Sequence, residues 1–299
     1  MLRVVKPVPF TLPMLVSSTA TDAAAWSAGT YAVGAIVTHN HPLTGMPRNW
    51  YSLVADNTET PGMDANKWQD SGPSNKTAMF DNRISSQTLQ TSSDMVVEYA
   101  PGQTVTTLAL LNVRGFSATV EVFEDSVLTY THTVYLTLEP VLDWFAYFTA
   151  PSEPLTRAIF SSVPIYYSSL VRITVTGTST AIGHCVAGMS YELGEVKYGA
   201  TSGIIDYSLK ETDEEFGGTV FVERDFADEN TFAIRIPKVR LNRVKQLLRS
   251  LRATPCLWIG SDEEEYTESL TTFGWYRSHS VVIEYHDEST LDLEIEGLT

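Results

Sequence analysis

Hydrophobic and polar residues alternate with the period of a β-strand in several stretches of the middle of the chain. Ser117–Phe123 reads Ser-Ala-Thr-Val-Glu-Val-Phe, Leu170–Thr178 reads Leu-Val-Arg-Ile-Thr-Val-Thr-Gly-Thr, and Val127–Leu138 alternates in the same way. Successive side chains of a strand point to opposite faces, so this pattern indicates strands with one buried face. Gly, Pro and Ser separate these strands. Residues 76–200 are therefore predicted to form a jelly roll or β-sandwich rather than βαβ units.

Residues 201–299 contain the one stretch with a convincing helical period, Lys238–Ala253. Its apolar positions follow the spacing i, i+3, i+4 and i+7, and they are Val244, Leu247, Leu248 and Leu251. This spacing predicts an amphipathic helix, with Pro237 at its start and Pro255 beyond its end. The strands expected around it are Thr219–Val222, Thr231–Ile236, Cys256–Ile259, Ser280–Tyr285 and Leu291–Ile295. The pattern favours an α+β domain.

The first 75 residues divide into two parts. Residues 1–20 are apolar and proline-bearing, so we expect an extended segment, either an arm that docks on a neighbour or a first edge strand. Residues 21–75 are rich in Trp, Tyr, Gly, Asn and Pro and predict short strands at Tyr31–Thr38 and Asn49–Ala55. The large side chains available for the core of this small module are Trp26, Trp50 and Trp68.

The chain is thus predicted to be mainly β. It would consist of an N-terminal extended arm (1–20), a small Trp-rich β module (21–75), a jelly-roll or β-sandwich middle domain (76–200), and an α+β C-terminal domain with one amphipathic helix (201–299). The chain has 299 residues, which is long enough for a sizeable core. Because 43% of the residues are hydrophobic, the composition is not that of a disordered tail.

Composition and charge narrow the classes of partner. No apolar run approaches the roughly 20 residues of a membrane-spanning helix, and the first residues lack the pattern of a secretory signal, so we expect no membrane insertion. The net charge of −16 argues against nucleic acid as a partner of the whole surface. Cys185 and Cys256 cannot alone build a disulfide framework or a four-ligand zinc site, so we expect two buried thiols and synthesis inside a cell.

The Trp-rich module carries a spaced set of aromatic, glycine and polar residues. The set reads W-x2-G-x-Y-x2-G-x2-V and then Y-x5-N-x3-P-x6-W, and its members are Trp26, Gly29, Tyr31, Gly34, Val37, Tyr51, Asn57, Pro61 and Trp68. The module resembles the chitin-binding-like carbohydrate-binding modules of polysaccharide hydrolases. The resemblance covers about one-fifth of the chain and implies exposed aromatic rings that stack on sugars. It makes Trp26, Trp50 and Tyr51 the candidate carbohydrate-binding residues, with structural packing as the alternative for Trp26.

The order of the parts carries a second resemblance. A chitin-binding-like module, the linker at residues 70–81, a jelly roll, and a C-terminal domain ending in Leu-Asp-Leu-Glu-Ile-Glu-Gly-Leu-Thr together resemble structural proteins of tailed-bacteriophage tails and baseplates. This resemblance implies a virion protein of the tail, assembled in the host cytoplasm. It also implies other tail or baseplate proteins as partners and a trimeric or hexameric homo-oligomer.

Candidate chemistry along the chain is sparse. His39 and His41 could share one face of a strand, but no cysteine or acidic residue stands near them, so a solvated hairpin loop is expected. The acidic runs at 211–215 and 262–265 lack the alternation and glycine of a calcium loop and predict solvated loops. No nucleophile-elbow, phosphate-loop or dinucleotide-loop motif is present. We therefore expect no catalytic residue, no metal and no cofactor.

The predicted helix is strongly basic within an acidic chain. Seven of the 20 basic residues lie between Arg235 and Arg252. Their side chains could be solvated or packed within their own domain, could meet an acidic face of another subunit, or, against the surrounding negative charge, could bind nucleic acid. We name as candidate subunit-contact residues Arg240, Arg243, Lys245, Arg249 and Arg252.

These patterns and resemblances lead to one expected function and two alternatives. The first is a non-enzymatic structural component of a phage tail tip or baseplate that docks through protein–protein contacts. The alternative is a carbohydrate-binding adhesin that recognises host surface polysaccharide. A polysaccharide-degrading enzyme is the least favoured reading, because no catalytic motif supports it. Sequence spacing does not exclude it, since the paired carboxylates of such an enzyme would come from distant strands.

Overall fold

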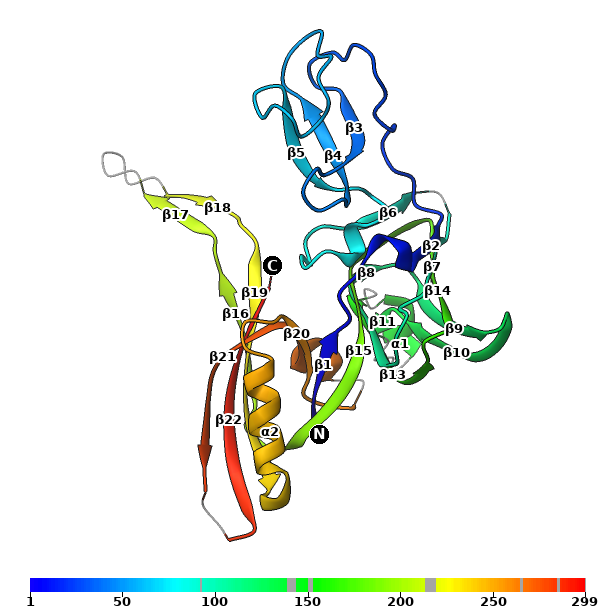
Figure 1. Cartoon of the computed structure of the whole chain (residues 1–299). Coiled ribbons are helices and arrows are strands. Elements are labelled where there is room, and N and C mark those ends of the chain that lie inside the picture. The colour runs from blue at the N-terminus through cyan, green and yellow to red at the C-terminus, as the bar shows by residue number, and fades with distance from the viewer. Residues whose placement is uncertain are drawn as a thin grey trace. The chain divides into compact units, whose positions relative to one another are not determined.

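The computed structural model describes residues 1–91, 93–138, 144–149, 153–212, 219–263, 266–283 and 286–298. The fold is mainly β, as the alternating pattern predicts (Figure 1). The chain forms two compact units. We call Met1–Pro7 with Ala187–Thr299 the barrel unit, and Val8–Val186 the sandwich unit.

The sandwich unit is built from two antiparallel sheets. One contains β13 (Arg157–Ile165), β8 (Val105–Arg114), the first part of β15 (Ser179–Val196) and β6 (Thr88–Thr91), in that order. The other contains β10 (Val127–Tyr135), β9 (Ser117–Glu124), β14 (Leu170–Thr176), β7 (Met95–Tyr99) and β2 (Leu15–Ser18). Alternate residues of β9 and β14 are buried, so the period of two read from the sequence places their apolar side chains in the core.

Smaller elements complete the sandwich unit. A three-stranded sheet of β3 (Ile36–Asn40), β4 (Pro47–Ser52) and β5 (Trp68–Pro73) forms the Trp-rich module, whose buried core is Val37, Trp50 and Trp68. The remaining short elements are η1 (Leu12–Met14), η2 (Ala78–Phe80), β11 (Thr137–Leu138), α1 (Trp144–Thr149) and β12 (Glu153–Pro154).

The barrel unit contains a closed ring of strands. From the second part of β15, the ring runs through β1 (Leu2–Pro7), β20 (Cys256–Ile259), β21 (Thr271–Val282), β22 (Glu288–Gly297) and β19 (Phe226–Pro237). Pairing of Glu195 with Arg235 and of Val196 with Ile234 brings β19 back to β15. Because the ring is closed, each of its strands has a neighbouring strand on both sides. The apolar side chains of the ring fill its interior.

Strand β1 differs from the expectation for the start of the chain. The expectation for residues 1–20 is an arm or an edge strand, but β1 pairs with β15 on one side and with β20 on the other. Later in the same segment, β2 does lie at the edge of the five-stranded sheet. Leu2, Val4 and Val5 are fully buried. The physical reason is that an apolar segment of this length gains more by filling a gap in a sheet than by lying on the surface.

The predicted amphipathic helix is confirmed as α2 (Lys238–Ser250). Val244 and Leu248 are buried in the barrel core, with Leu241 and Leu247 packed beside them. Pro237 precedes the first turn in an extended conformation, and Arg249 lies in the last turn, where a cation interacts favourably with the helix dipole. The short helix α3 (Thr267–Leu270) precedes β21.

A β-hairpin extends from the ring. Strand β16 (Thr201–Asp206) pairs with the first half of β19, and beyond it β17 (Leu209–Thr212) and β18 (Thr219–Val222) form a separate two-stranded sheet. Figure 1 shows β17 and β18 continuing away from the ring within the barrel unit. We call residues 209–212 with 219–222 the hairpin.

Across the described ranges, no helix combines the length and the apolar character needed to cross a membrane.

Candidate functional site

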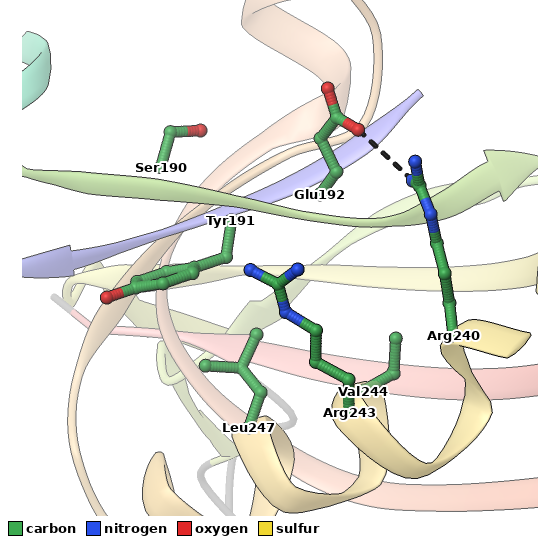
Figure 2. Close-up of a pocket in the computed structure, with 7 residues that line it drawn as sticks. All are labelled: Ser190, Tyr191, Glu192, Arg240, Arg243, Val244 and Leu247. Atoms are coloured by element: carbon green, nitrogen blue, oxygen red, sulfur yellow. Dashed lines mark hydrogen bonds and ion pairs between the residues drawn. The ribbon is translucent and has the colours of Figure 1, made fainter.

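A pocket of about 260 Å³ lies between strand β15 and helix α2 of the barrel unit (Figure 2). It is lined by Ser190, Tyr191 and Glu192 from the strand and by Arg240, Arg243, Val244 and Leu247 from the helix. The helical residues follow the spacing i, i+3, i+4 and i+7, so they share one side of α2. We call it the arginine pocket.

The two arginines of this pocket are in different electrostatic states. Arg240 donates a hydrogen bond of 3.2 Å to the carboxylate of Glu192, and both side chains are 53% exposed. Such an exposed pair contributes only about 0–1 kcal/mol to stability, but it neutralises Arg240 locally. Arg243 has no ion pair with any described residue. The pocket therefore carries one uncompensated guanidinium.

The surroundings of Arg243 are suited to a carboxylate with apolar neighbours. Arg243 extends from α2 toward the ring of Tyr191, with Leu247 on the same side of the helix (Figure 2). A guanidinium presents a planar fork of N–H donors that fits both oxygens of a carboxylate. Apolar carbon next to the fork lowers the competition from water. The pocket can thus bind an acidic side chain flanked by apolar ones.

A neighbouring hollow of about 500 Å³ is internally neutralised. Its lining comprises Met1, Gly194, Glu195, Arg235, Pro237, Arg240, Asp287 and Glu288. Arg235 forms an ion pair with Glu288 and lies 3.9 Å from Glu195. The hydrogen bond from Arg235 lowers the pKa of Glu288, which keeps this carboxylate charged. Arg235 is thereby occupied and does not offer a free cation.

The other basic residues of α2 do not join the arginine pocket. Lys245 and Arg249 are exposed and lie on the opposite flank of α2 from Arg243, and Arg252 is exposed just beyond the end of the helix. No ion pair links them to the described part of the chain. The structure therefore brings together Arg240 and Arg243 of the five candidate contact residues, and leaves three as a separate basic flank.

The candidate carbohydrate-binding residues do not converge. Trp50 is only 5% exposed and its indole N–H donates to the carbonyl of His39 at 3.0 Å. Trp26 is partly buried against the same core and meets the ring of His39 edge-on at 5.2 Å. Tyr51 neighbours Trp50 in β4, so it projects to the opposite face. Trp50 cannot offer a ring face to a sugar, because a small module needs its large aromatics for the core.

The other residues named from the sequence have structural environments. His41 stacks on Trp50 with ring centroids 6.0 Å apart. The described residues contain no group of three His, Cys, Asp or Glu side chains that could hold a metal ion. Asp262 pairs with Arg3, and the acidic residues at 213–215 and 264–265 all lie outside the described residues. Cys185 and Cys256 are buried, as predicted, and burial raises the pKa of each thiol to about 12.

The sandwich unit carries a polar groove of about 590 Å³ with internally paired charges. Arg172 lies 2.9 Å from Glu98 and 3.6 Å from Glu121, and Ser17 donates to Glu98 at 2.8 Å. These hydrogen bonds, first from Ser17 and then from Arg172, lower the pKa of Glu98. A carboxylate held in its charged form in this way is a poor general acid at neutral pH.

Two groups of exposed apolar residues were not found from the sequence. Leu209, Val220, Phe221 and Val222 of the hairpin are exposed, although Thr219–Val222 had been expected only as one strand among others. Trp144, Phe145 and Phe148 of α1 are exposed as well. The density of aromatics in Trp-Phe-Ala-Tyr-Phe could have signalled α1. Nothing local distinguishes Thr-Val-Phe-Val from a buried strand.

Comparisons with known proteins add little to this geometry. No protein-family model matches the chain, and no curated protein sequence is significantly similar to it. Among solved structures, the chain is similar to chitosan-binding module 1 derived from a chitosanase/glucanase of Paenibacillus sp. IK-5, with 14% sequence identity and a TM-score of 0.27. The similarity covers 38% of this chain and 83% of that module. A likeness of this extent carries no conclusion about what this chain binds.

Proposed function

We propose that this protein is a non-enzymatic structural subunit of a larger assembly, held in place by protein–protein contacts of its barrel unit. We further propose that the assembly is the tail tip or baseplate of a tailed bacteriophage. The observation that carries the first part is the hairpin, whose apolar side chains are exposed on a two-stranded sheet.

The hairpin is not stabilised by a core of its own. Phe221 is 72% exposed and Val220 is 62% exposed. Strands β17 and β18 form a sheet of two strands, and an isolated two-stranded hairpin is at best marginally stable in water. Exposed apolar side chains and unpaired strand edges are features of surfaces that another protein covers. A subunit contact would supply the missing burial.

Two hollows that described residues line are compatible with a role without catalysis. In the arginine pocket and in the polar groove, the lining residues include no histidine or cysteine. Glu98 pairs with Arg172, and hydrogen bonds from Ser17 and Arg172 lower the pKa of Glu98, which makes it a poor general acid at neutral pH. Glu192 pairs with Arg240. The tail assignment itself rests on the resemblance in domain order and on the acidic, cysteine-poor composition.

Immunogold labelling of phage particles that encode this chain tests the proposal. Antibody against the purified protein is expected to place gold at the tail tip. A variant with Val220→Thr, Phe221→Thr and Val222→Thr should keep its circular dichroism spectrum but be lost from particles. The matched control is Val239→Thr, an exposed valine on α2, which should be incorporated normally. Protein found free in the lysate, with unlabelled particles, would contradict the proposal.

A second candidate, carbohydrate binding, is favoured by one observation in α1. Trp144 is 79% exposed, Phe145 and Phe148 are similarly exposed, and the rings of Trp144 and Phe148 stack with centroids 6.4 Å apart. Exposed aromatic faces match the apolar C–H face of a sugar ring.

Retention of the protein on host cells tests this second candidate. Trp144→Ala is expected to reduce retention, whereas Phe116→Ala, another exposed aromatic in the sandwich unit, should not. Equal retention of both variants and the unchanged protein would remove carbohydrate binding through α1.

A further inference from the structure

The hairpin has one face that combines apolar side chains with a single carboxylate. In its antiparallel register Leu209 pairs with Val222 and Glu211 pairs with Val220. Directly opposed residues of two strands, and residues two apart in one strand, project to the same side. Leu209, Glu211, Val220 and Val222 therefore share one face, which we call the acidic face of the hairpin.

The opposite face of the hairpin has a different character. Lys210 lies over the ring of Phe221, with its ammonium nitrogen 5.9 Å from the ring centroid. This contact partly occupies both side chains. The acidic face is the one that presents an unengaged carboxylate, because no ion pair joins Glu211 to any residue that the structure describes.

The arginine pocket is complementary to the acidic face in both charge and polarity. It offers the uncompensated guanidinium of Arg243 beside Tyr191 and Leu247. A carboxylate reaching Arg243 would form charge-assisted hydrogen bonds, and apolar neighbours of that carboxylate would cover Tyr191 and Leu247.

We propose that the acidic face of the hairpin of one copy binds the arginine pocket of a second copy, with Glu211 of the first paired with Arg243 of the second. This inference rests on the proposed role as an assembly subunit and names the contact that the assembly would use.

The partner of the pocket is a second copy because the hairpin cannot reach the pocket of its own chain. The hairpin leads into the first residue of β19, Phe226, whereas α2 begins directly after its last residue, Pro237. A strand of 12 residues spans roughly 36 Å at about 3.3 Å per residue. Within the barrel unit, Figure 1 shows the hairpin extending beyond the end of β19 that is opposite the start of α2, whereas α2 runs beside the ring.

Charges around the two surfaces agree with this pairing. Asp206, Glu223 and Asp225 are exposed near the base of the hairpin. The basic flank consists of Lys245 and Arg249 on α2 and of Arg252 just beyond its end. Opposite fields of this kind orient two copies before contact. Because the two patches differ, the contact is heterologous, and repetition produces a closed ring where the rotation between copies closes.

Charge reversal and its rescue test the contact in the full chain. Glu211→Arg alone and Arg243→Glu alone are each expected to weaken self-association by about tenfold or more, since like charges would then face each other. The protein carrying both reversals restores an opposite pair at every contact and is expected to recover most of the lost affinity. Sedimentation velocity over a concentration series gives the association constants.

Two matched controls separate this contact from a general effect of charge. Lys245→Glu makes the same change in charge on the other flank of α2, and Glu223→Arg makes it near the base of the hairpin. Both substitutions lie outside the proposed pair, so each is expected to change association by less than the single reversals at Glu211 and Arg243. Circular dichroism checks that every variant remains folded.

The outcomes distinguish this contact from the proposed function. Oligomers that are insensitive to Glu211→Arg, or a double reversal without rescue, overturn the pairing and leave the assembly role standing. If the chain stays monomeric up to its solubility limit, a second copy is not the partner of the arginine pocket. The same conclusion holds if Arg243 is found to bind a different acidic protein. Particles whose tails carry no gold, with the protein free in the lysate, overturn the proposed function instead.

Discussion

At the scale of single residues, His184 combines deep burial with an ionisable ring. Its side chain is 4% exposed in β15, within the sandwich unit. Burial penalises the charged imidazolium and lowers the pKa of His184 to about 4, although a hydrogen bond with the backbone of Met79 acts in the opposite direction. The ring is therefore neutral in the folded protein at neutral pH.

We predict that His184 makes stability depend on pH between about 6.5 and 4. In this window the unfolded chain binds a proton that the folded chain does not, so the free energy of unfolding falls as pH falls, by on the order of 3 kcal/mol in total. Urea titrations at pH 7, 6, 5 and 4.5 measure this slope. His184→Gln should flatten the slope, and His286→Gln, at an exposed histidine, should not. An unchanged slope in His184→Gln would assign the acid sensitivity to other groups.

At the candidate sites, the sequence gives the type of each residue but not which other residues surround it. The sequence shows that Arg240 and Arg243 are basic and on one side of a helix. It does not show that Glu192, almost fifty positions earlier, neutralises the first and not the second. In the same way, Trp50 and Trp68 are both aromatic anchors of the small module, and their burial follows from the folded sheet.

At the scale of elements, close approach between strands constrains Gly274. A Cβ atom at this position would lie 2.0 Å from the carbonyl oxygen of Glu296 and 2.6 Å from the Cα of Gly297. Both of these atoms belong to the backbone of β22, the partner of β21 in the ring. Only a residue without a side chain allows the two strands to pair at this distance.

Gly274→Ala is accordingly expected to lower the free energy of unfolding by about 2 kcal/mol or more, since the strands must separate to admit the methyl group. Gly203→Ala in β16 is the matched control. The nearest atom to its Cβ would be the carbonyl oxygen of Glu229 at 4.0 Å, so little change is expected. Thermal and urea unfolding of both variants provide the comparison. Equal stability of the two would mean that β21 and β22 have more space than the structure shows.

Elements were predictable where their signal is local. Helix α2 begins at the expected Lys238, and strands β9, β14, β18 and β20 fall where alternation or apolar runs place them. Whether a predicted element is buried or exposed depends less on local sequence. Thr219–Val222 is the expected strand, but whether a strand lies in a core or in an exposed hairpin depends on its neighbours, which the segment itself does not encode.

At the scale of the whole molecule, the barrel unit depends on residues from both ends of the sequence. Val4 of β1 is fully buried and pairs with Tyr191 on one side and Trp258 on the other. An ionised side chain at this position would be left without a partner inside the ring. The sandwich unit has its own buried residues between Val8 and Val186.

Val4→Asp is therefore expected to remove protection from hydrogen exchange in residues 187–298 while β8, β9 and β14 of the sandwich unit stay protected. Lys6→Asp, an exposed position in the same strand, should leave both units protected. Hydrogen-exchange mass spectrometry reads the two units separately. Simultaneous loss of protection in both would show that they unfold as one cooperative unit.

The sequence by itself determined the mainly β class, the amphipathic helix, its basic charge and the buried nature of both thiols. These properties follow from periodicity and composition over short windows, which the chain carries in any context. Only the tertiary structure decided that β1 lies inside a ring, that Trp50 is core and that Arg243 stands uncompensated beside Tyr191. Each of these depends on pairing between residues far apart in sequence, which is selected by the burial and register of the complete sheet rather than by any one segment.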